Sequence, residues 1–353
     1  MIGQMFMVGL KATELSAEER LVFDELGIGG VLLLKHNLSD PEQIVALCCS
    51  LRDLKTDHPP FIAIDEEGGR VHRLPAPFTH FPPAAAIERK NDPDLAYRLG
   101  KATAKELRLV GINLNFAPVL DVNSNLQNPV IGDRSFAADP VKVIKFSEKW
   151  AQGLRDGGII PCGKHFPGHG NTDKDSHLAL PVVDRSLEEL TAVELAPFAH
   201  ACRNKMEALM TAHVLYPALD TKLAATLSHP IITGLLRQQW GYDGVVFSDD
   251  LEMNAISDNY GDEVAADFCA RAGVDVLLYG HELAKMQNVF EFLASAAARD
   301  AVLRGQVENS YRRIANLKGR FLKTFTGVTH EPVRLRLIRF GHQRLIEAIY
   351  GNR

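Results

Sequence analysis

Short apolar runs alternate with amphipathic segments of helical length along this 353-residue chain, and this alternation limits the fold more than any other feature. Eight of the apolar runs have the length and aliphatic content of buried strands. The predicted strands are Met5–Leu10, Gly30–Leu34, Phe61–Asp65, Asn113–Leu120, Ile159–Lys164, Ala208–His213, Gly244–Ser248 and Val274–Tyr279. Because these runs are continuously apolar, both faces of the predicted sheet should be covered.

Helix start signals stand between the predicted strands. Ser16 and Ser186 are each followed three residues later by a glutamate, which is the pattern of a capping box. Pro41 and Pro140 each follow an aspartate and therefore suit a first helical position. The predicted helices include Ser16–Leu26, Pro41–Leu54, Asp94–Val110, Pro140–Asp156, Ser186–Lys205, Pro230–Trp240 and Asp262–Ala272.

Strands that alternate with helices in this way favour an α/β protein with a parallel sheet. Closed on itself, such a sheet is a single-domain (β/α)8 TIM barrel, and this is the fold we predict. The rival is a doubly wound open sheet, which would carry a glycine-rich loop after its first strand. The segment Leu10–Thr13 is not such a loop.

No linker, low-complexity tract or internal repeat divides the chain. We therefore expect residues 1–325 to form the barrel. The pattern loosens over residues 326–353, which we expect to form a peripheral C-terminal helix or tail. Four arginines gather there, namely Arg334, Arg336, Arg339 and Arg344.

The composition excludes several classes of partner. A net charge of −5 gives no reason to expect nucleic acid or an anionic membrane. No apolar run approaches the ~20 residues that span a bilayer, and the N-terminal segment Met1–Leu10 lacks the basic start of a signal peptide. The five cysteines show no C-x-x-C spacing and fit reduced, buried thiols, so we expect a cytoplasmic protein.

Polar residues follow several of the predicted strands, where barrels of this kind keep their working groups. The third strand is followed by Asp65–Arg73, the loop after the fourth contains Gly132–Arg134, and the seventh ends in Ser248–Asp250. The fifth strand opens a long polar loop, Lys164–His177, with three histidines, two aspartates and two lysines. We therefore expect a functional site at this end of the barrel.

These blocks resemble the family 3 glycoside hydrolases, and within them the bacterial β-N-acetylglucosaminidases of peptidoglycan recycling. The resemblance rests on Ala63–Arg73, Ile131–Phe136, Lys164–Gly170 with Asp175–His177, and Phe247–Leu251. It spans nearly the whole barrel. Larger β-glucosidases of the family add a domain that supplies a glutamate acid, whereas this chain carries the Asp175–His177 element. The resemblance thus implies the single-domain N-acetylglucosaminidase branch.

The activity that the resemblance implies is that of a retaining exo-β-N-acetylglucosaminidase, with no metal and no organic cofactor. The implied substrate is a peptidoglycan fragment with N-acetylglucosamine β-1,4-linked to 1,6-anhydro-N-acetylmuramic acid, with or without peptide. We expect this small sugar to be the partner, with no nucleic acid and no membrane, and we expect a monomer.

Cleavage of a glycosidic bond needs one group at the anomeric carbon and another that protonates the leaving oxygen. Asp249 is the candidate nucleophile, at the position where the resemblance places that of the family. His177 is the candidate acid/base. Asp175 lies two residues before it, on the same side of an extended segment, and can orient the imidazole. Asp250 points to the opposite side of its strand from Asp249, and we expect it to be structural.

Asp65, Arg73, Arg134, Lys164 and His165 are the candidate substrate-binding residues. Carboxylates and cations suit hydroxyl recognition because they form charge-assisted hydrogen bonds, and the resemblance assigns all five to the N-acetylglucosamine subsite. From the residues alone, Lys164 and Arg134 could instead neutralise Asp249.

Other residues of the same blocks have supporting roles in this hypothesis. His169 is expected to form structural hydrogen bonds inside its turn, and His213 either touches the sugar or packs beneath it. Gly168, Gly170 and Asn171 are expected to be bending points of a mobile loop. Glu66, Glu67, Arg70 and His72 flank the site.

Three competing hypotheses stay open. A metal-dependent hydrolase could use the imidazoles of His165, His169, His177 and His213, although the first strand ends without a ligand pair. A non-catalytic sugar sensor would need no nucleophile. A substrate-assisted hexosaminidase would use the sugar's own acetamido group, with Asp249 and Asp250 as its acidic pair.

Overall fold

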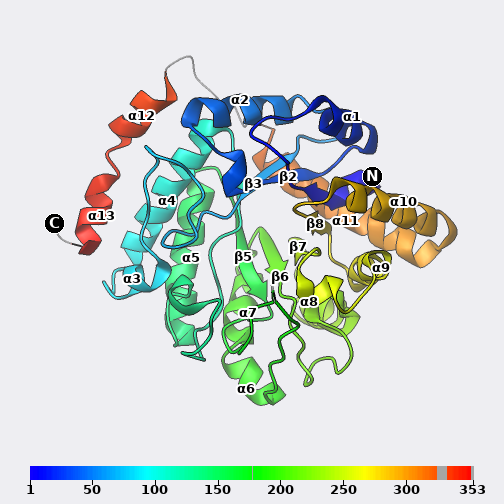
Figure 1. Cartoon of the computed structure of the whole chain (residues 1–353). Coiled ribbons are helices and arrows are strands. Elements are labelled where there is room, and N and C mark those ends of the chain that lie inside the picture. The colour runs from blue at the N-terminus through cyan, green and yellow to red at the C-terminus, as the bar shows by residue number, and fades with distance from the viewer. Residues whose placement is uncertain (177, 324–331, 351–353) are drawn as a thin grey trace.

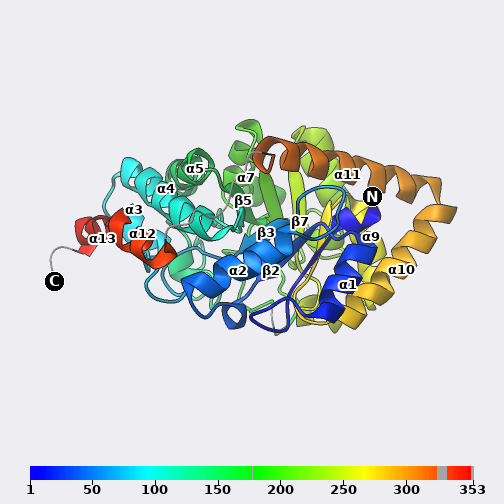
Figure 2. The ribbon, with the colours of Figure 1, turned by 90° about the horizontal axis from the view of Figure 1, so that it is seen from above.

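The computed structural model describes residues 1–176, 178–323 and 332–350, and its eight parallel strands close into a barrel surrounded by helices (Figure 1, Figure 2). The strands pair in chain order, and β8 pairs with β1. The bounds are β1 Phe6–Val8, β2 Gly30–Leu33, β3 Phe61–Ile64, β4 Leu114–Asn115, β5 Ile160–Phe166, β6 Ala208–Thr211, β7 Val245–Asp250 and β8 Val276–Tyr279. The predicted (β/α)8 fold is confirmed.

The helices lie between the strands and at the C-terminal end. Their bounds are α1 Ala17–Leu26, α2 Pro41–Arg52, α3 Ala84–Glu88, α4 Pro93–Val110, α5 Pro140–Asp156, α6 Leu187–Ala192, α7 Leu195–Arg203, α8 Asn254–Ser257, α9 Asp262–Ala272, α10 Leu283–Arg299, α11 Ala301–Phe321, α12 Val333–Phe340 and α13 Gln343–Tyr350. A helix of the wider π pattern, Pro230–Gln239, precedes β7, and short 3-10 turns cover Ile2–Met5, Lys35–Asn37, Gly132–Arg134 and Ala225–Leu227.

Helix starts follow the sequence signals closely. Ser16 and Ser186 both form the complete capping box with the glutamate three residues later. The predicted helix Ser186–Lys205, however, is divided into α6 and α7. Pro197 stands in the first turn of α7, where its missing N–H costs nothing, whereas inside one long helix it would break the hydrogen-bond ladder. The division is therefore a local effect of proline.

Two strands differ from their predicted bounds. The fourth is predicted over Asn113–Leu120 but pairs only at Leu114–Asn115, because Pro118 has no N–H to continue a ladder. The seventh continues two residues beyond Ser248, so that Asp249 and Asp250 belong to β7 itself. A candidate catalytic residue thus stands on rigid strand backbone.

Aromatic side chains fill the inside of the barrel. Phe61 of β3 and Phe116 after β4 both pack edge-on against Phe247 of β7, with ring centroids 5.7 and 5.4 Å apart. All three side chains are fully buried. Because this packed layer closes the barrel below the strand ends, a ligand has room only beyond it.

The C-terminal segment forms two helices, α12 and α13, where the sequence suggests one. They turn at Gly341, which has a φ of 61°, and they pack against α2 and α4 (Figure 1). Residues 324–331, where the expected boundary at 325 falls, are outside the described residues. That residues 1–325 are the catalytic unit therefore stays a proposal. Within the described ranges, no helix combines the length and apolarity needed to cross a membrane.

Candidate active site

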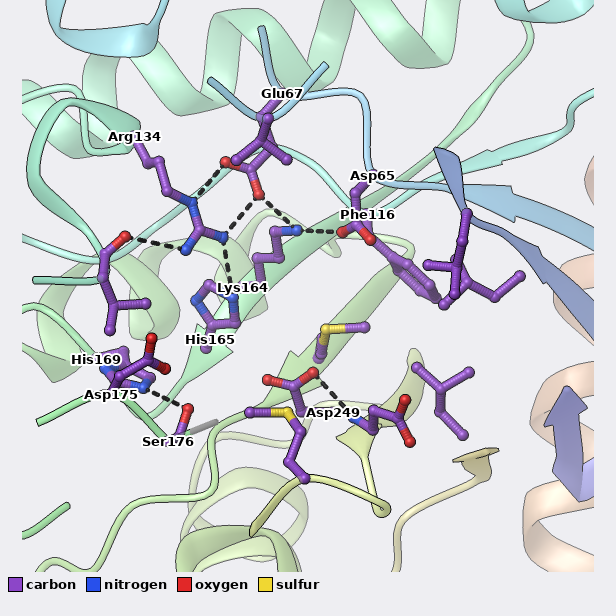
Figure 3. Close-up of a pocket in the computed structure, with 18 of the residues that line it drawn as sticks. Asp65, Glu67, Phe116, Arg134, Lys164, His165, His169, Asp175, Ser176 and Asp249 are labelled. Carbon is purple, nitrogen blue, oxygen red and sulfur yellow. Dashed lines mark hydrogen bonds and ion pairs between the residues drawn. The ribbon is translucent and has the colours of Figure 1, made fainter. Parts of the chain in front are cut away.

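A cavity of about 490 Å³ opens at the C-terminal ends of the strands (Figure 3). Its walls come from β3, β5 and β7 and from the loops that follow β3, β4 and β5. The candidate site residues that line it are Asp65, Arg73, Arg134, Lys164, His165, Asp175 and Asp249. Seven of the eight candidate residues are thus brought together, although they come from distant parts of the chain. The eighth, His177, lies outside the described residues.

Two cations and two carboxylates form a buried cluster at one side of this cavity (Figure 3). Lys164 Nζ lies 2.5 Å from Asp65 Oδ1 and 2.6 Å from Glu67 Oε1. Arg134 donates from Nε and Nη2 to the two oxygens of Glu67, at 2.9 and 2.8 Å. Each buried charge therefore has an opposite partner, which is the condition for keeping it ionised.

The charges of this cluster hold one another in place. Burial alone would raise the pKa of Glu67, but Arg134 and Lys164 hold it far below its ordinary value. Burial would likewise lower the pKa of Lys164, yet Asp65 and Glu67 raise it. Glu67 is only a flanking residue in the sequence hypothesis, although it lies two positions after Asp65. That spacing places both on one side of an extended segment and could have identified it.

A second buried carboxylate, Asp121, fixes the start of the histidine-rich loop. Its Oδ2 bonds His165 Nδ1 at 2.7 Å, and its Oδ1 accepts the backbone N–H groups of His165 and His169 at 3.1 and 2.6 Å. Burial would raise the pKa of Asp121, but these partners lower it. The sequence hypothesis does not include Asp121 among the site residues. The contact explains how His165 faces the cavity with Nε2, 3.5 Å from Arg134 Nη2.

His169 holds the loop from within. Its Nδ1 bonds Thr172 Oγ1 at 2.8 Å and its Nε2 bonds Ser176 Oγ at 3.1 Å. Burial lowers the pKa of His169 to about 4, so the ring is neutral near pH 7. This fits the structural role expected of it, and the bond to Ser176 fixes the neighbour of Asp175.

Asp249 points into the cavity from β7, across from the charge cluster (Figure 3). Its Oδ1 accepts the N–H of Asp250 at 2.9 Å. The Asp250 carboxylate instead accepts the N–H groups of Glu252 and Gly280, at 3.0 and 3.3 Å. Burial, with Glu252 and Asp249 nearby, raises the pKa of Asp250 to about 7. Asp249 is thus placed for attack on a bound sugar, whereas Asp250 ties β7 to the end of β8.

His213 packs beneath the site instead of facing it. It is fully buried, with Nδ1 bonded to Thr226 Oγ1 at 2.8 Å and Nε2 donating to the carbonyl of Asp250 at 2.9 Å. Of the two roles that the sequence leaves open, sugar contact and support, the structure favours support.

Arg73 offers hydrogen-bonding capacity to a ligand. Its side chain lines the cavity, and its buried Nε has no hydrogen-bond partner among the described residues. A buried guanidinium N–H in this state costs free energy unless a ligand or water accepts from it. A sugar hydroxyl or carbonyl oxygen would satisfy it.

The imidazoles of the loop do not gather around one point. His165 faces Asp121, His169 lies between Thr172 and Ser176, and His213 lies under β7. Within residues 1–176, 178–323 and 332–350, no group of three or more His, Cys, Asp or Glu side chains is placed to hold a metal ion. The described part of the chain therefore offers no ligand set for the metal-hydrolase hypothesis.

Comparison with known proteins identifies relatives of this barrel. A family model described as the glycosyl hydrolase family 3 N terminal domain matches residues 1–317. A β-hexosaminidase of Methylococcus capsulatus is 39% identical over 323 residues, which cover 89% of this chain and 91% of that protein.

Solved structures give the same answer. A glycoside hydrolase family 3 β-N-acetylglucosaminidase from Paenibacillus has a TM-score of 0.88 and 37% identity, over 96% of this chain and 67% of its own. NagZ from Neisseria gonorrhoeae, solved in complex with N-trifluoroacetyl-D-glucosamine, has a TM-score of 0.78 and 31% identity. That alignment covers 98% of this chain and 97% of the Neisseria chain.

Proposed function

The chain belongs to glycosyl hydrolase family 3 and is a β-hexosaminidase of that family, and we propose that it is a retaining exo-β-N-acetylglucosaminidase. The main support is that Asp249 and Asp175 line the same cavity as the buried cluster of Lys164, Arg134 and their carboxylates. A sugar bound against this cluster has a carboxylate on one side and the loop of Asp175 and His177 on the other.

Binding comes from the rigid wall of the cavity. Asp65 and Lys164 offer an acceptor and a donor to neighbouring hydroxyls, while Arg134 and Arg73 offer N–H groups. Because the cluster is already neutralised internally, it need not reorganise when the sugar arrives. Such preorganised groups give strong selectivity for a ligand with hydroxyls in the right places.

The chemistry proceeds in two displacements. In the first, an Asp249 oxygen forms a bond to the anomeric carbon while the bond to the leaving oxygen breaks, and His177 gives that oxygen a proton. In the second, His177 takes a proton from water, the water oxygen bonds to the anomeric carbon, and Asp249 leaves. Asp175 orients the imidazole and balances its charge when it is protonated. Two inversions leave the β configuration unchanged.

The proposed substrate is a peptidoglycan fragment with terminal N-acetylglucosamine β-1,4-linked to 1,6-anhydro-N-acetylmuramic acid, with or without peptide. The family membership and the sugar analogue in the Neisseria structure support this class of ligand. The volume of about 490 Å³ leaves space beyond a single sugar ring for part of the leaving group. We also propose a cytoplasmic monomer, in keeping with five cysteines that are all free thiols.

Covalent trapping tests the role of Asp249. Incubation with a 2-fluoro N-acetylglucosaminide should leave a glycosyl group on the peptide that contains Asp249, as detected by mass spectrometry. Asp249→Ala should lower kcat on a chromogenic N-acetylglucosaminide by about 10³-fold or more, whereas the exposed Asp258→Ala should match the wild type. Absence of a covalent adduct, with turnover intact, would indicate the substrate-assisted mechanism. The bonds of Asp250 to two backbone amides already argue against its serving as the second acid of that mechanism.

Two further measurements test the metal-hydrolase and sugar-sensor hypotheses. Treatment with a chelator should leave turnover unchanged, and a loss restored by zinc would support the metal hydrolase. Product analysis on a muropeptide mixture should show release of N-acetylglucosamine. A protein that binds the sugar but releases none would be the sugar sensor.

A further inference from the structure

The loop between β3 and α3, residues 65–83, carries three cavity residues, Asp65, Glu67 and Arg73, on a long irregular segment. Its inner part is fastened by Glu66, whose carboxylate bonds His72 Nδ1 at 2.6 Å and accepts the N–H of Arg73 at 3.0 Å. The backbone position of Arg73 therefore depends on how this loop folds back on itself.

Contacts between the two halves of the loop continue this chain outward. The His72 ring stacks on that of His80, with centroids 4.4 Å apart and planes within 7°. His80 Nε2 donates to the carbonyl of Gly69 at 2.6 Å, and the Gly69 N–H donates to the carbonyl of Phe81 at 2.8 Å. The segment Thr79–Phe81 thus forms the outer support of the segment that bears Glu67 and Arg73.

This outer support rests on a buried carboxylate of α4. Glu106 accepts the N–H and the hydroxyl of Thr79, at 2.9 and 2.6 Å. The same Oε1 atom bonds His342 Nδ1 at 2.7 Å, and both Glu106 and His342 are buried. The His342 ring also lies 5.2 Å from that of Phe340 and 6.1 Å from that of Phe81.

His342 belongs to the turn between α12 and α13, so a residue near the C-terminus meets the loop of β3 at Glu106. Figure 1 and Figure 2 both place α12 and α13 beside α3 and α4, on the outer side of the barrel. We propose that α12 and α13 act as a brace and that His342 is a positioning residue, which through Glu106 and Thr79 holds the 65–83 loop in its sugar-binding shape. The kinetic part of this proposal rests on the proposed function.

Hydrogen exchange and kinetics on the full-length enzyme test the brace together. In His342→Ala, the backbone amides of residues 66–80 should exchange faster than in the wild type, while those of β5 and β7 should not change. KM for a chromogenic N-acetylglucosaminide should rise by about fivefold, with kcat altered less than about twofold, because the loop binds the sugar but does not supply the nucleophile.

Matched variants separate positioning from general damage. His342→Asn should restore most of the effect, since its amide nitrogen can take the place of Nδ1, and Arg344→Ala, exposed in the same segment, should match the wild type. Thr79→Val breaks the contact from the loop side. Combined with His342→Ala, it should raise KM by less than the product of the two single effects, because both act through Glu106.

Three results would overturn the brace. They are unchanged exchange over residues 66–80 in His342→Ala, full multiplicativity in the double variant, or equal damage from Arg344→Ala. If His342→Ala does not fold, Thr79→Val gives the same exchange reading from the loop. A wild-type enzyme without turnover would defeat the proposed function alone, because the exchange measurement would still decide the brace.

Discussion

Neighbouring aspartates at the end of β7 have different environments because successive strand residues point to opposite sides. Asp249 faces the cavity, and Asp250 is held by the amides of Glu252 and Gly280. At the scale of single residues, one peptide step therefore separates the proposed nucleophile from a structural carboxyl.

The raised pKa of Asp250 predicts a pH-dependent effect of its replacement. In the unfolded chain the carboxyl ionises near its ordinary value of 3.8, but in the native state the pKa is about 7. Between these values the native state binds more protons, so stability falls as the pH rises. Asp250→Asn should therefore gain stability over the wild type from pH 4 to pH 7, by on the order of 3 kcal/mol.

Urea denaturation at several pH values measures this gain. Asp258→Asn, an exposed control, should show a constant difference from the wild type across the same range. A constant difference for Asp250→Asn as well would mean that the Asp250 carboxyl is ionised in the native state throughout.

Elements of the barrel approach one another closely where side chains are absent. A Cβ on Gly100 of α4 would lie 2.4 Å from the carbonyl oxygen of Trp150, and one on Gly153 of α5 would lie 2.3 Å from that of Tyr97. The two helices therefore touch backbone to backbone. This contact supports α4, which carries Glu106.

Gly100→Ala is accordingly expected to destabilise the fold by about 2–3 kcal/mol, the usual range for overpacking. The matched change Gly305→Ala in α11 meets no atom within 4 Å and should stabilise by up to about 1 kcal/mol, because alanine favours helix. Thermal or chemical denaturation of the two variants compares them directly. Equal effects would show that α4 and α5 can move apart without cost.

The loop that follows β5 is anchored at both ends on Glu194, at the start of α7. Glu194 Oε1 accepts from Arg185 Nη1 at 2.8 Å and from Ser124 Oγ at 3.0 Å. Ser124 Oγ in turn accepts from the Asn171 side chain at 3.2 Å. The segment between Asn171 and Arg185, which contains Asp175, therefore begins and ends on one buried carboxylate.

Glu194→Ala should lower kcat more than it raises KM, because it releases the loop with the proposed proton-transfer groups. It should also destabilise the fold by about 2 kcal/mol, since Arg185 is left without its buried partner. Glu194→Gln keeps the acceptor and should be intermediate. Steady-state kinetics with melting curves, and Glu188→Ala on the surface of α6 as control, test this. An unchanged kcat in Glu194→Ala would mean that the loop is held elsewhere.

On the scale of the whole molecule, a lysine near the C-terminal end of the barrel sequence closes its lower end. Lys318 of α11 is buried, and its Nζ donates to Gln4 Oε1 and to the carbonyl of Gly29, both at 2.7 Å. Nζ lies 4.6 Å from the ring centroid of Phe61. One side chain thus joins α11 to the starts of the first three strands.

Burial holds the pKa of Lys318 well below its ordinary value. The unfolded chain binds this proton up to about pH 10.5, whereas the native state does not. The contribution of Lys318 to stability therefore rises with pH until the unfolded lysine also loses its proton. The stability of the wild type relative to Lys318→Met should increase from pH 7 to pH 10, as measured by urea denaturation. The exposed Lys145→Met should show no such trend, and a flat difference for Lys318→Met would mean that the lysine is charged in the native state.

Much of this protein can be predicted from its sequence because the signals are local. The eight apolar runs, the caps at Ser16 and Ser186, and the polar residues after several strands depend only on neighbours in the chain. Since the ends of parallel strands meet on one face of a barrel, these signals also predict that Asp65, Lys164 and Asp249 share a site, and they do.

Tertiary structure alone decided what depends on contacts across the closed barrel. The carboxylates Glu67, Asp121 and Glu106 take their roles from partners far away in the chain, namely Arg134, His165 and His342. The division of α6 from α7 followed from Pro197, but the close approach of α4 to α5 had no local signal. A sequence pattern shows where a side chain points on its own element, and only the packing of elements fixes which distant charge it meets.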